Sequence, residues 1–212
     1  CLTQVFSSLL FLARQGLKIC GREDVNSDFK QLLKLRYDDS SDLLLWLNRK
    51  TTWTSVEIQE EILQSMSLTI IRHFAKVTKE RKYFGIIADE TADCSSQEQL
   101  TVCLRTVSDN FDVEETFFGM YSLDRCDSPT IFRSIEDVLL RLNLEMKDCK
   151  AVCFDGAAAY ISETIGVANC IQEKSPSVVK THCYIQCVNL AVQDAVSKVP
   201  LMHDFLQLIQ EL

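Results

Sequence analysis

Residues Tyr83–Arg105 read YFGIIADETADCSSQEQLTVCLR, and the pattern of this stretch decides the fold. It opens with the short continuous apolar run Tyr83–Ala88, which is typical of a strand buried on both faces of a sheet. A second run, Leu100–Val107, begins inside the stretch and is rich in residues that favour strands. The stretch therefore predicts two strands of one sheet.

The sequence downstream continues with further strands and then alternates strands with helices. A third strand-forming run lies at Thr116–Leu123, and the polar segment Ser108–Glu115 before it suits a hairpin turn. Ser128–Pro129 opens a helix, because this pair is typical of a helix N-terminus. The remaining elements are a strand at Ala151–Phe154, a helix over about 157–173, a strand at Val178–Cys183 and a helix over about 185–196. Three strands joined by short turns, followed by this alternation, predict an α/β fold with a mixed sheet that is partly parallel.

The sequence upstream has helical spacing throughout. Gly16 is expected to end the first helix. The predicted helices are Phe6–Ala13, Asp28–Arg36, Asp42–Leu47 and a long amphipathic helix from Val56 to about Glu80. We therefore expect an all-helical segment over residues 1–82 and the sheet domain over 83–212.

Composition and charge exclude several classes of protein. No apolar run reaches the roughly 18 residues that a membrane span requires, and no basic residues precede the apolar N-terminal run as in a signal peptide. The chain has 22 basic and 30 acidic residues, a net charge of −8, so it lacks the basic surface that dominates phosphate binding. The ten cysteines include no CxxC pair and are expected to be reduced thiols in the cytoplasm or nucleus. The start without Met and the apolar pattern that runs up to Leu212 predict a fragment, incomplete at its C-terminus.

Two acidic residues follow predicted strands and are the candidates for chemistry. Asp89 comes directly after Tyr83–Ala88, and Asp155 comes directly after Ala151–Phe154. If these strands are parallel neighbours, both carboxylates leave the same edge of the sheet and can share Mg²⁺ through oxygen ligands. The alternative is that each aspartate only starts a turn or caps the next helix.

These residues lie in a chain that resembles hAT-like transposase proteins, in the form found in MYM-type zinc-finger and related transposon-derived proteins. Tyr83–Arg105 looks like the first catalytic block of that family, and the other similar blocks are Ser7–Leu17, Thr54–Leu63, Asp137–Ala158 and Thr181–Val196. The resemblance implies an RNase H-like fold in which Asp89 and Asp155 match the first and second catalytic acids. It also places the third acid, a glutamate, beyond Leu212, so no residue of this chain is assigned to it.

The chain departs from the family pattern in two places. Where the second block commonly reads DGAxNM, this chain has Ala159 in place of Asn. Where a later block commonly reads HCxxHxLNL, this chain has Gln186 in place of the second His, followed by Cys187. An amide does not transfer protons as an imidazole does, so these changes favour a catalytically degenerate domain. A zinc site at His182, Cys183 and Cys187 is the less favoured interpretation, because three candidate ligands leave a tetrahedral site one short.

The leading expectation is a nuclear, or alternatively cytoplasmic, transposon-derived protein with a degenerate RNase H-like domain that serves a DNA-associated or protein-interaction role. The alternatives are a fragment of an active hAT DNA transposase that uses two metal ions, and an unrelated α/β interaction module. We expect no required cofactor, with Mg²⁺ or Mn²⁺ at Asp89 and Asp155 if the domain is active. The resemblance places DNA contacts outside this fragment and protein partners or a homodimer in a further C-terminal region; no membrane association is expected.

Overall fold

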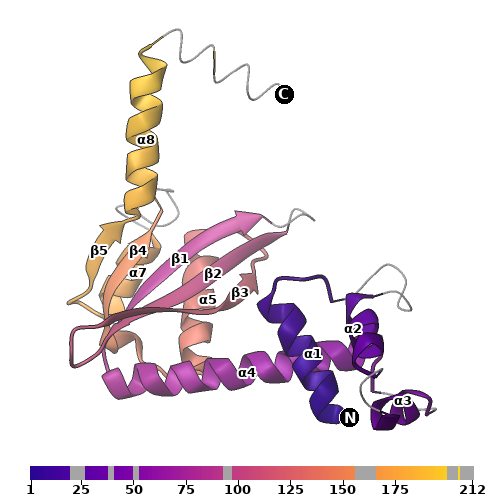
Figure 1. Cartoon of the computed structure of the whole chain (residues 1–212). Helices are drawn as coiled ribbons and strands as arrows, with labels where there is room; N and C mark the ends of the chain where they lie inside the picture. Colours follow the sequence, from indigo (N-terminus) through magenta and orange to yellow (C-terminus); the bar gives the residue numbers. More distant parts are fainter. Residues whose placement is uncertain are drawn as a thin grey trace. The chain divides into compact units, whose positions relative to one another are not determined.

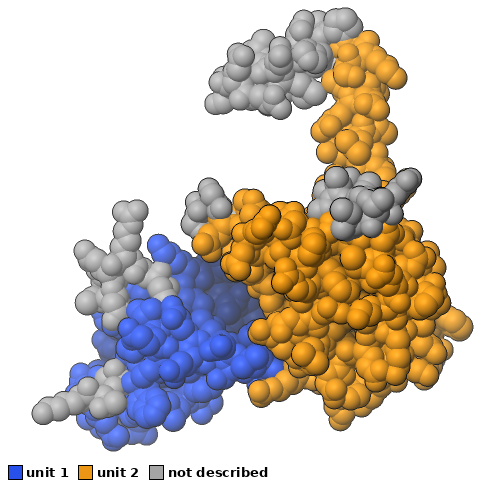
Figure 2. Space-filling model, turned by 180° about the vertical axis from the view of Figure 1, so that it is seen from behind, with its two compact units in different colours: residues 1–71 blue, residues 72–212 orange. Residues whose placement is uncertain are grey.

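The computed structural model describes residues 1–19, 27–37, 41–49, 53–92, 97–155, 166–199 and 205. The chain divides into two compact units, Cys1–Ile71 and Arg72–Leu212 (Figure 2). This division falls inside a helix. The domain boundary expected from the sequence, between residues 82 and 83, is not tested by it and stays a prediction. In the part of the chain that the structure describes, every helix is too short or too polar to cross a membrane.

The first unit is helical, as the sequence predicts. Its elements are α1 (Leu2–Arg14), α2 (Asp28–Tyr37), α3 (Ser41–Leu47) and the first part of α4 (Val56–Arg81). Gly16 follows α1 with a φ of 63°, and the amide of Leu17 returns to the carbonyl of Leu12 at 3.0 Å. This left-handed residue ends the helix because glycine adopts the conformation without a side-chain penalty.

The core of this unit consists of apolar side chains from α1, α2 and α4. The buried members are Val5, Leu9, Leu12, Phe29, Leu33 and Ile62. Arg36 ties α2 to α1, since its Nη1 donates to the carbonyl of Gln4 at 3.1 Å and to the hydroxyl of Ser8 at 2.9 Å. The unit is therefore held by an apolar centre with a polar clamp between its helices.

The second unit contains a five-stranded mixed sheet, which confirms the predicted fold class (Figure 1). Its strands are β1 (Phe84–Ala92), β2 (Glu98–Val107), β3 (Val113–Ser122), β4 (Cys149–Phe154) and β5 (Val179–His182). Their order across the sheet is β3-β2-β1-β4-β5. The first three form an antiparallel meander, while β4 pairs in parallel with both β1 and β5.

Two helices and a short 3-10 turn connect the later strands: α5 (Ser128–Arg141), η2 (Met146–Asp148) and α7 (Val167–Lys174). A further helix, α8 (Tyr184–Ser197), follows β5. The cap of α5 is Asp127, whose Oδ1 accepts from the amide of Thr130 at 3.0 Å, with Pro129 in the first turn. The helix predicted over about 157–173 is observed as α7 in its described part; residues 157–165 lie outside the described residues.

One face of the sheet is covered and the other is half open. Phe84, Ile86 and Ala88 of β1 are buried, in alternation with the half-buried Gly85 and Ile87. Figure 1 draws α5 and α7 on the same side of the sheet, and the inward residues of both helices are buried. The expectation that β1 is buried on both faces is therefore wrong, because helices in the described region cover only the face that carries its even-numbered residues.

Two predicted boundaries also differ from the structure. β1 continues through Asp89 to Ala92, because every residue in this range pairs with β2. The last pair is Ala92 of β1 with Glu98 of β2. The hairpin turn is shorter than Ser108–Glu115, because pairing resumes at Val113 and the amide of Ser108 donates to the carbonyl of Asp112 at 2.9 Å. In both places the ladder hydrogen bonds outweigh the weak strand propensity of acidic residues.

Candidate functional site

Asp89 and Asp155 lie on neighbouring parallel strands. Residues Phe84–Ile87 of β1 pair with β4, and Ile87 stands opposite Cys153. Asp89 and Asp155 are each two residues further along in this register. Because side chains alternate between faces, both carboxylates project from the same face at the carboxyl ends of the two strands. The structure thus brings the two sequence-predicted candidates together.

The two carboxylates interact electrostatically. Burial raises the pKa of Asp89 above its ordinary value, and the negative charge of Asp155 raises this pKa further. A hydrogen bond from the backbone amide of Glu90 acts in the opposite direction. The net effect is a carboxylate that is less easily ionised, because it is partly desolvated and a like charge is close by. A bound cation would relieve this repulsion.

The surroundings of the pair belong to the open face of the sheet. Thr101 of β2 stands opposite Asp89. Ile87 and Cys153 precede the two aspartates by two residues, on the same face of the sheet. Thr101, Ile87 and Cys153 are half-buried. The carboxylate pair is therefore accessible at one end of a partly apolar surface.

The donor set fits one hard cation. Mg²⁺ in proteins is usually held by one or two carboxylates, with the remaining positions filled by water and substrate phosphates. Asp89 and Asp155 supply two such carboxylates. Among the residues that the structure describes, no group of three or more His, Cys, Asp or Glu side chains is arranged to hold a metal ion. The described residues thus give a two-carboxylate site and no larger one.

The other candidate ligands lie at the start of α8. His182 ends β5, Cys183 precedes α8, and Cys187 lies in its first turn. The amide of Cys183 donates to the carbonyl of Phe154 at 2.8 Å, which joins this corner to the end of β4. In the part of the chain that the structure describes, these three side chains are not grouped so that they could hold a metal ion. Ala159 lies outside the described residues, whereas Gln186 lies on α8.

The sequence did not indicate a polar cluster on the covered side of Asp89. Burial is the largest cause that raises the pKa of the Cys126 thiol to about 12, and the carboxylates of Glu90 and Glu98 beside it act in the same direction. Oε1 of Glu90 is buried without a hydrogen-bond partner in the described structure. Glu90 is therefore half-buried beside other polar groups. Asp93 lies outside the described residues.

Comparison with known proteins places the chain in a family. A model of the DUF4371 family, described as "ZMYM1/FAM200, RNase-like domain", matches residues 1–166. The chain belongs to this family. The DUF4371 match covers the first unit and the second unit up to residue 166, including both aspartates, and it confirms the family and the RNase-like fold expected from the sequence blocks.

Two curated relatives are similar to most of the chain. The human "52 kDa repressor of the inhibitor of the protein kinase" is 22% identical over 207 residues, which are 89% of this chain and 26% of the relative. The mouse protein of the same name is 22% identical over 198 residues, 86% of this chain and 26% of the relative. The chain thus spans about a quarter of the length of these relatives, and the family's RNase-like domain occurs in repressor-type proteins.

Proposed function

We propose that this chain is the RNase H-like core of a transposon-derived nuclear regulatory protein, and that the core binds a divalent cation without cleaving DNA. It serves a DNA-associated or partner-binding role in the longer protein. The observation that carries the proposal is the shared edge of Asp89 and Asp155, where the charge of one raises the pKa of the other.

The geometry supports binding more than cleavage. Two-metal phosphodiester chemistry uses one ion to activate the attacking oxygen and a second to stabilise the leaving oxygen. Two carboxylates suffice to hold a single ion together with a phosphate oxygen, and the described residues offer no third acid beside them. Asp89 and Asp155 would hold the ion, and the ion would supply a positive charge that orients a phosphate at the sheet edge.

The departures from the family pattern favour the same conclusion. Gln186 stands where the family commonly has a histidine, and Ala159 stands where it commonly has an asparagine. The amide of Gln186 cannot exchange a proton with a substrate at neutral pH as an imidazole can, and Ala159 lacks the hydrogen-bonding amide of the asparagine. The name of the two relatives, which calls them repressors, supports a regulatory role.

The test is strand cleavage by the complete protein with Mg²⁺ and with Mn²⁺. Wild type is compared with Asp89→Asn and Asp155→Asn, and Asp124→Asn, an exposed aspartate of the loop after β3, serves as the matched control. We expect the same background signal from all four proteins. Cleavage by wild type and the control, with loss in both site variants, would overturn the proposal and establish an active hAT-type transposase.

The third interpretation, an unrelated α/β interaction module, predicts that the two aspartates lie far apart. Asp89 and Asp155 lie instead on or directly after neighbouring parallel strands, in a chain that belongs to an RNase-like family. These observations favour the transposon-derived protein over the unrelated module.

A further inference from the structure

A cavity of about 580 Å³ lies at the opposite end of the strands from Asp89 and Asp155. It is formed where β1 and β4 begin and where β2 ends. Twelve residues line it, and those with the chemistry used below are Arg81, Tyr83, Arg105, Asp109, Phe111 and Lys150. Its size falls within the range that small-molecule and cofactor sites occupy, ~300–1,000 Å³.

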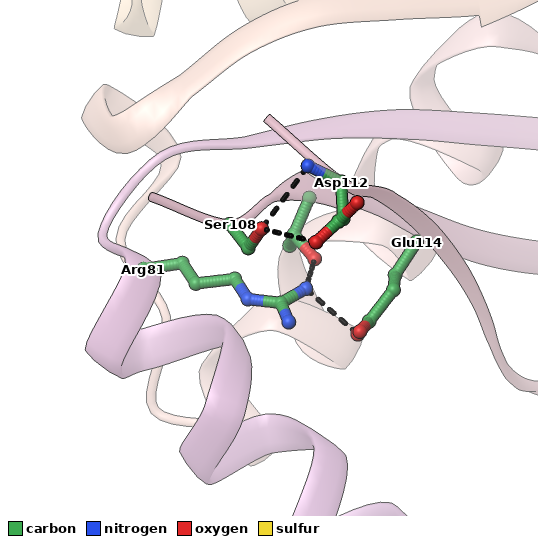
Figure 3. A network of polar contacts seen from close by, with 5 residues as sticks. Arg81, Ser108, Asp112 and Glu114 are labelled. Atoms are coloured by element: carbon green, nitrogen blue, oxygen red, sulfur yellow. Dashed lines mark hydrogen bonds and ion pairs between the residues drawn. The ribbon is translucent and has the colours of Figure 1, made fainter. Parts of the chain in front are cut away.

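The two arginines of the cavity, Arg81 and Arg105, both have a carboxylate partner, but their ion pairs differ in exposure. Arg81 donates to Glu114 at 2.7 Å and to the hydroxyl of Thr106 at 2.6 Å, so its charge is paired (Figure 3). Arg105 pairs with Glu115 at 3.0 Å, but both side chains are about half exposed. Exposed pairs of this kind are weak and exchange their partners readily.

Two lysines beside the cavity have no carboxylate partner among the residues that the structure describes. Nζ of Lys150 donates to the hydroxyl of Ser177 at 3.0 Å and to the carbonyl of Lys147 at 3.2 Å. Nζ of Lys82 and Nζ of Lys150 lie 5.2 Å and 5.1 Å from the ring centroid of Tyr83. Both ammonium groups therefore lie close to the ring of Tyr83, and their charges remain available to an anion.

A second aromatic side chain is held out from the β2–β3 turn. Phe111 is 86% exposed and has a φ of 66°, a conformation that is unfavourable for a bulky residue. The turn enforces it, since the amide of Phe111 donates to the carbonyl of Ser108 at 2.9 Å and the amide of Asp112 donates to the hydroxyl of Ser108 at 3.1 Å. The ring of Phe111 is thus exposed at the cavity, where it is open to contact with a ligand.

We propose that this cavity binds a nucleotide unit, with the phosphate on Lys82 and Lys150 and the base against Tyr83 and Phe111. A planar base stacks on aromatic rings, and a phosphate pairs with ammonium groups. The site goes beyond the function proposed above, because it lies at the other end of the sheet and requires neither Asp89 nor Asp155. The nucleotide comes from a nucleic acid strand or from a free mononucleotide, and the experiment separates these sources.

The distribution of charge favours a nucleotide over an acidic peptide. The carboxylates of Asp109, Asp112 and Glu114 gather on the hairpin side, where they surround Arg81. An acidic peptide would bring negative charge against this side. A nucleotide places an uncharged base there and directs its one phosphate to the lysines on the β1 and β4 side.

The experiment uses the full chain and fluorescence anisotropy with a labelled oligothymidylate of about eight nucleotides, within the usual site size of single-strand binders. Tyr83→Leu removes the ring and is expected to weaken binding about tenfold. Lys150→Gln is expected to weaken binding several-fold and to reduce the salt slope by about 0.7, the share of one single-strand phosphate contact. Lys147→Gln is the matched control, because it removes the same charge from an exposed residue that pairs with Glu145 outside the cavity. It should bind like wild type.

A second pair of variants tests the exposed phenylalanine. Phe111→Leu should weaken binding, whereas Phe117→Leu, an exposed phenylalanine on the open sheet face, should not. Competition with a free mononucleotide distinguishes the sources: displacement at similar concentration indicates a free nucleotide, and its absence indicates a strand. The inference is overturned if the folded wild type binds neither probe. It is also overturned if Tyr83→Leu and Lys150→Gln bind like Lys147→Gln, or if polyglutamate displaces the DNA as well as a second oligonucleotide does. Cleavage assays do not bear on it, so the proposed function and this site fail separately.

Discussion

Asp89 of β1 and Asp155 after β4 are brought to one face of the sheet by the parallel pairing of Ile87 with Cys153. The first aspartate is nearly seventy positions away from the second along the sequence, yet its ionisation depends on the second one's charge. The two carboxylates therefore lie close enough to interact, as a shared site requires.

Asp89→Asn is expected to increase stability slightly at neutral pH. The pKa of Asp89 is raised in the folded state above its unfolded value of 3.8, so the folded protein binds the proton more tightly. The contribution of Asp89 to the free energy of unfolding is then greatest below the unfolded pKa and falls as pH rises through the folded pKa. The gain at pH 7 should be no more than about 1 kcal/mol, because the residue is exposed and screened.

Urea unfolding at pH 7 and at pH 3 measures this effect. The difference between Asp89→Asn and wild type should be present at pH 7 and absent at pH 3, where Asp89 is protonated in both states. A variant that is less stable than wild type at pH 7 would show that the carboxylate makes favourable contacts instead.

Asp127→Ala is expected to destabilise α5 with the opposite dependence on pH. Hydrogen bonds from Thr130 lower the pKa of Asp127, which caps the helix. Its contribution is present above the unfolded pKa and is lost as pH falls through the lower folded pKa. Thermal unfolding at pH 7 should show a lower Tm for Asp127→Ala, and Asp127→Ser should retain most of the wild-type Tm because serine also caps helices. Equal Tm values for the alanine and serine variants would contradict the assigned cap.

Phe118→Ala is expected to cost about 3–5 kcal/mol of unfolding free energy, as for other buried aromatic residues. Phe118 is 1% exposed and occupies the irregularity of β3, where pairing passes from Gly119 to Phe117. Phe117→Ala, at the exposed neighbouring position, should cost less than about 1 kcal/mol. Chemical denaturation of the two variants checks this. A similar loss for both would mean that the open face of the sheet is covered in solution.

Most of the fold could be predicted from the sequence because its periodicities are strong. The switch from helical spacing to short apolar runs near Tyr83 fixes the order of elements, and the short Ser108–Asp112 turn makes the antiparallel meander the simplest pairing. The extension of β1 through Asp89 was not predictable, since acidic residues are poor strand formers and only the partner strand stabilises them there.

The candidate site was predictable in its residues and not in its surroundings. Strand ends identify Asp89 and Asp155, but an apolar run such as Tyr83–Ala88 does not reveal that a helix covers only one face. Glu90 illustrates the same limit. Its neighbour Glu98 lies on the next strand, and Cys126 follows β3, far along the sequence. Their proximity to Glu90 therefore depends on the pairing of β1 with β2 and on the course of the chain after β3.

The most direct test of the paired carboxylates is calorimetric titration of the full chain with Mg²⁺. The account predicts saturable binding of one ion by wild type and by Asp124→Asn, and loss of that binding in both Asp89→Asn and Asp155→Asn. Binding that persists unchanged in either site variant, or that is absent from the folded wild type, would contradict it.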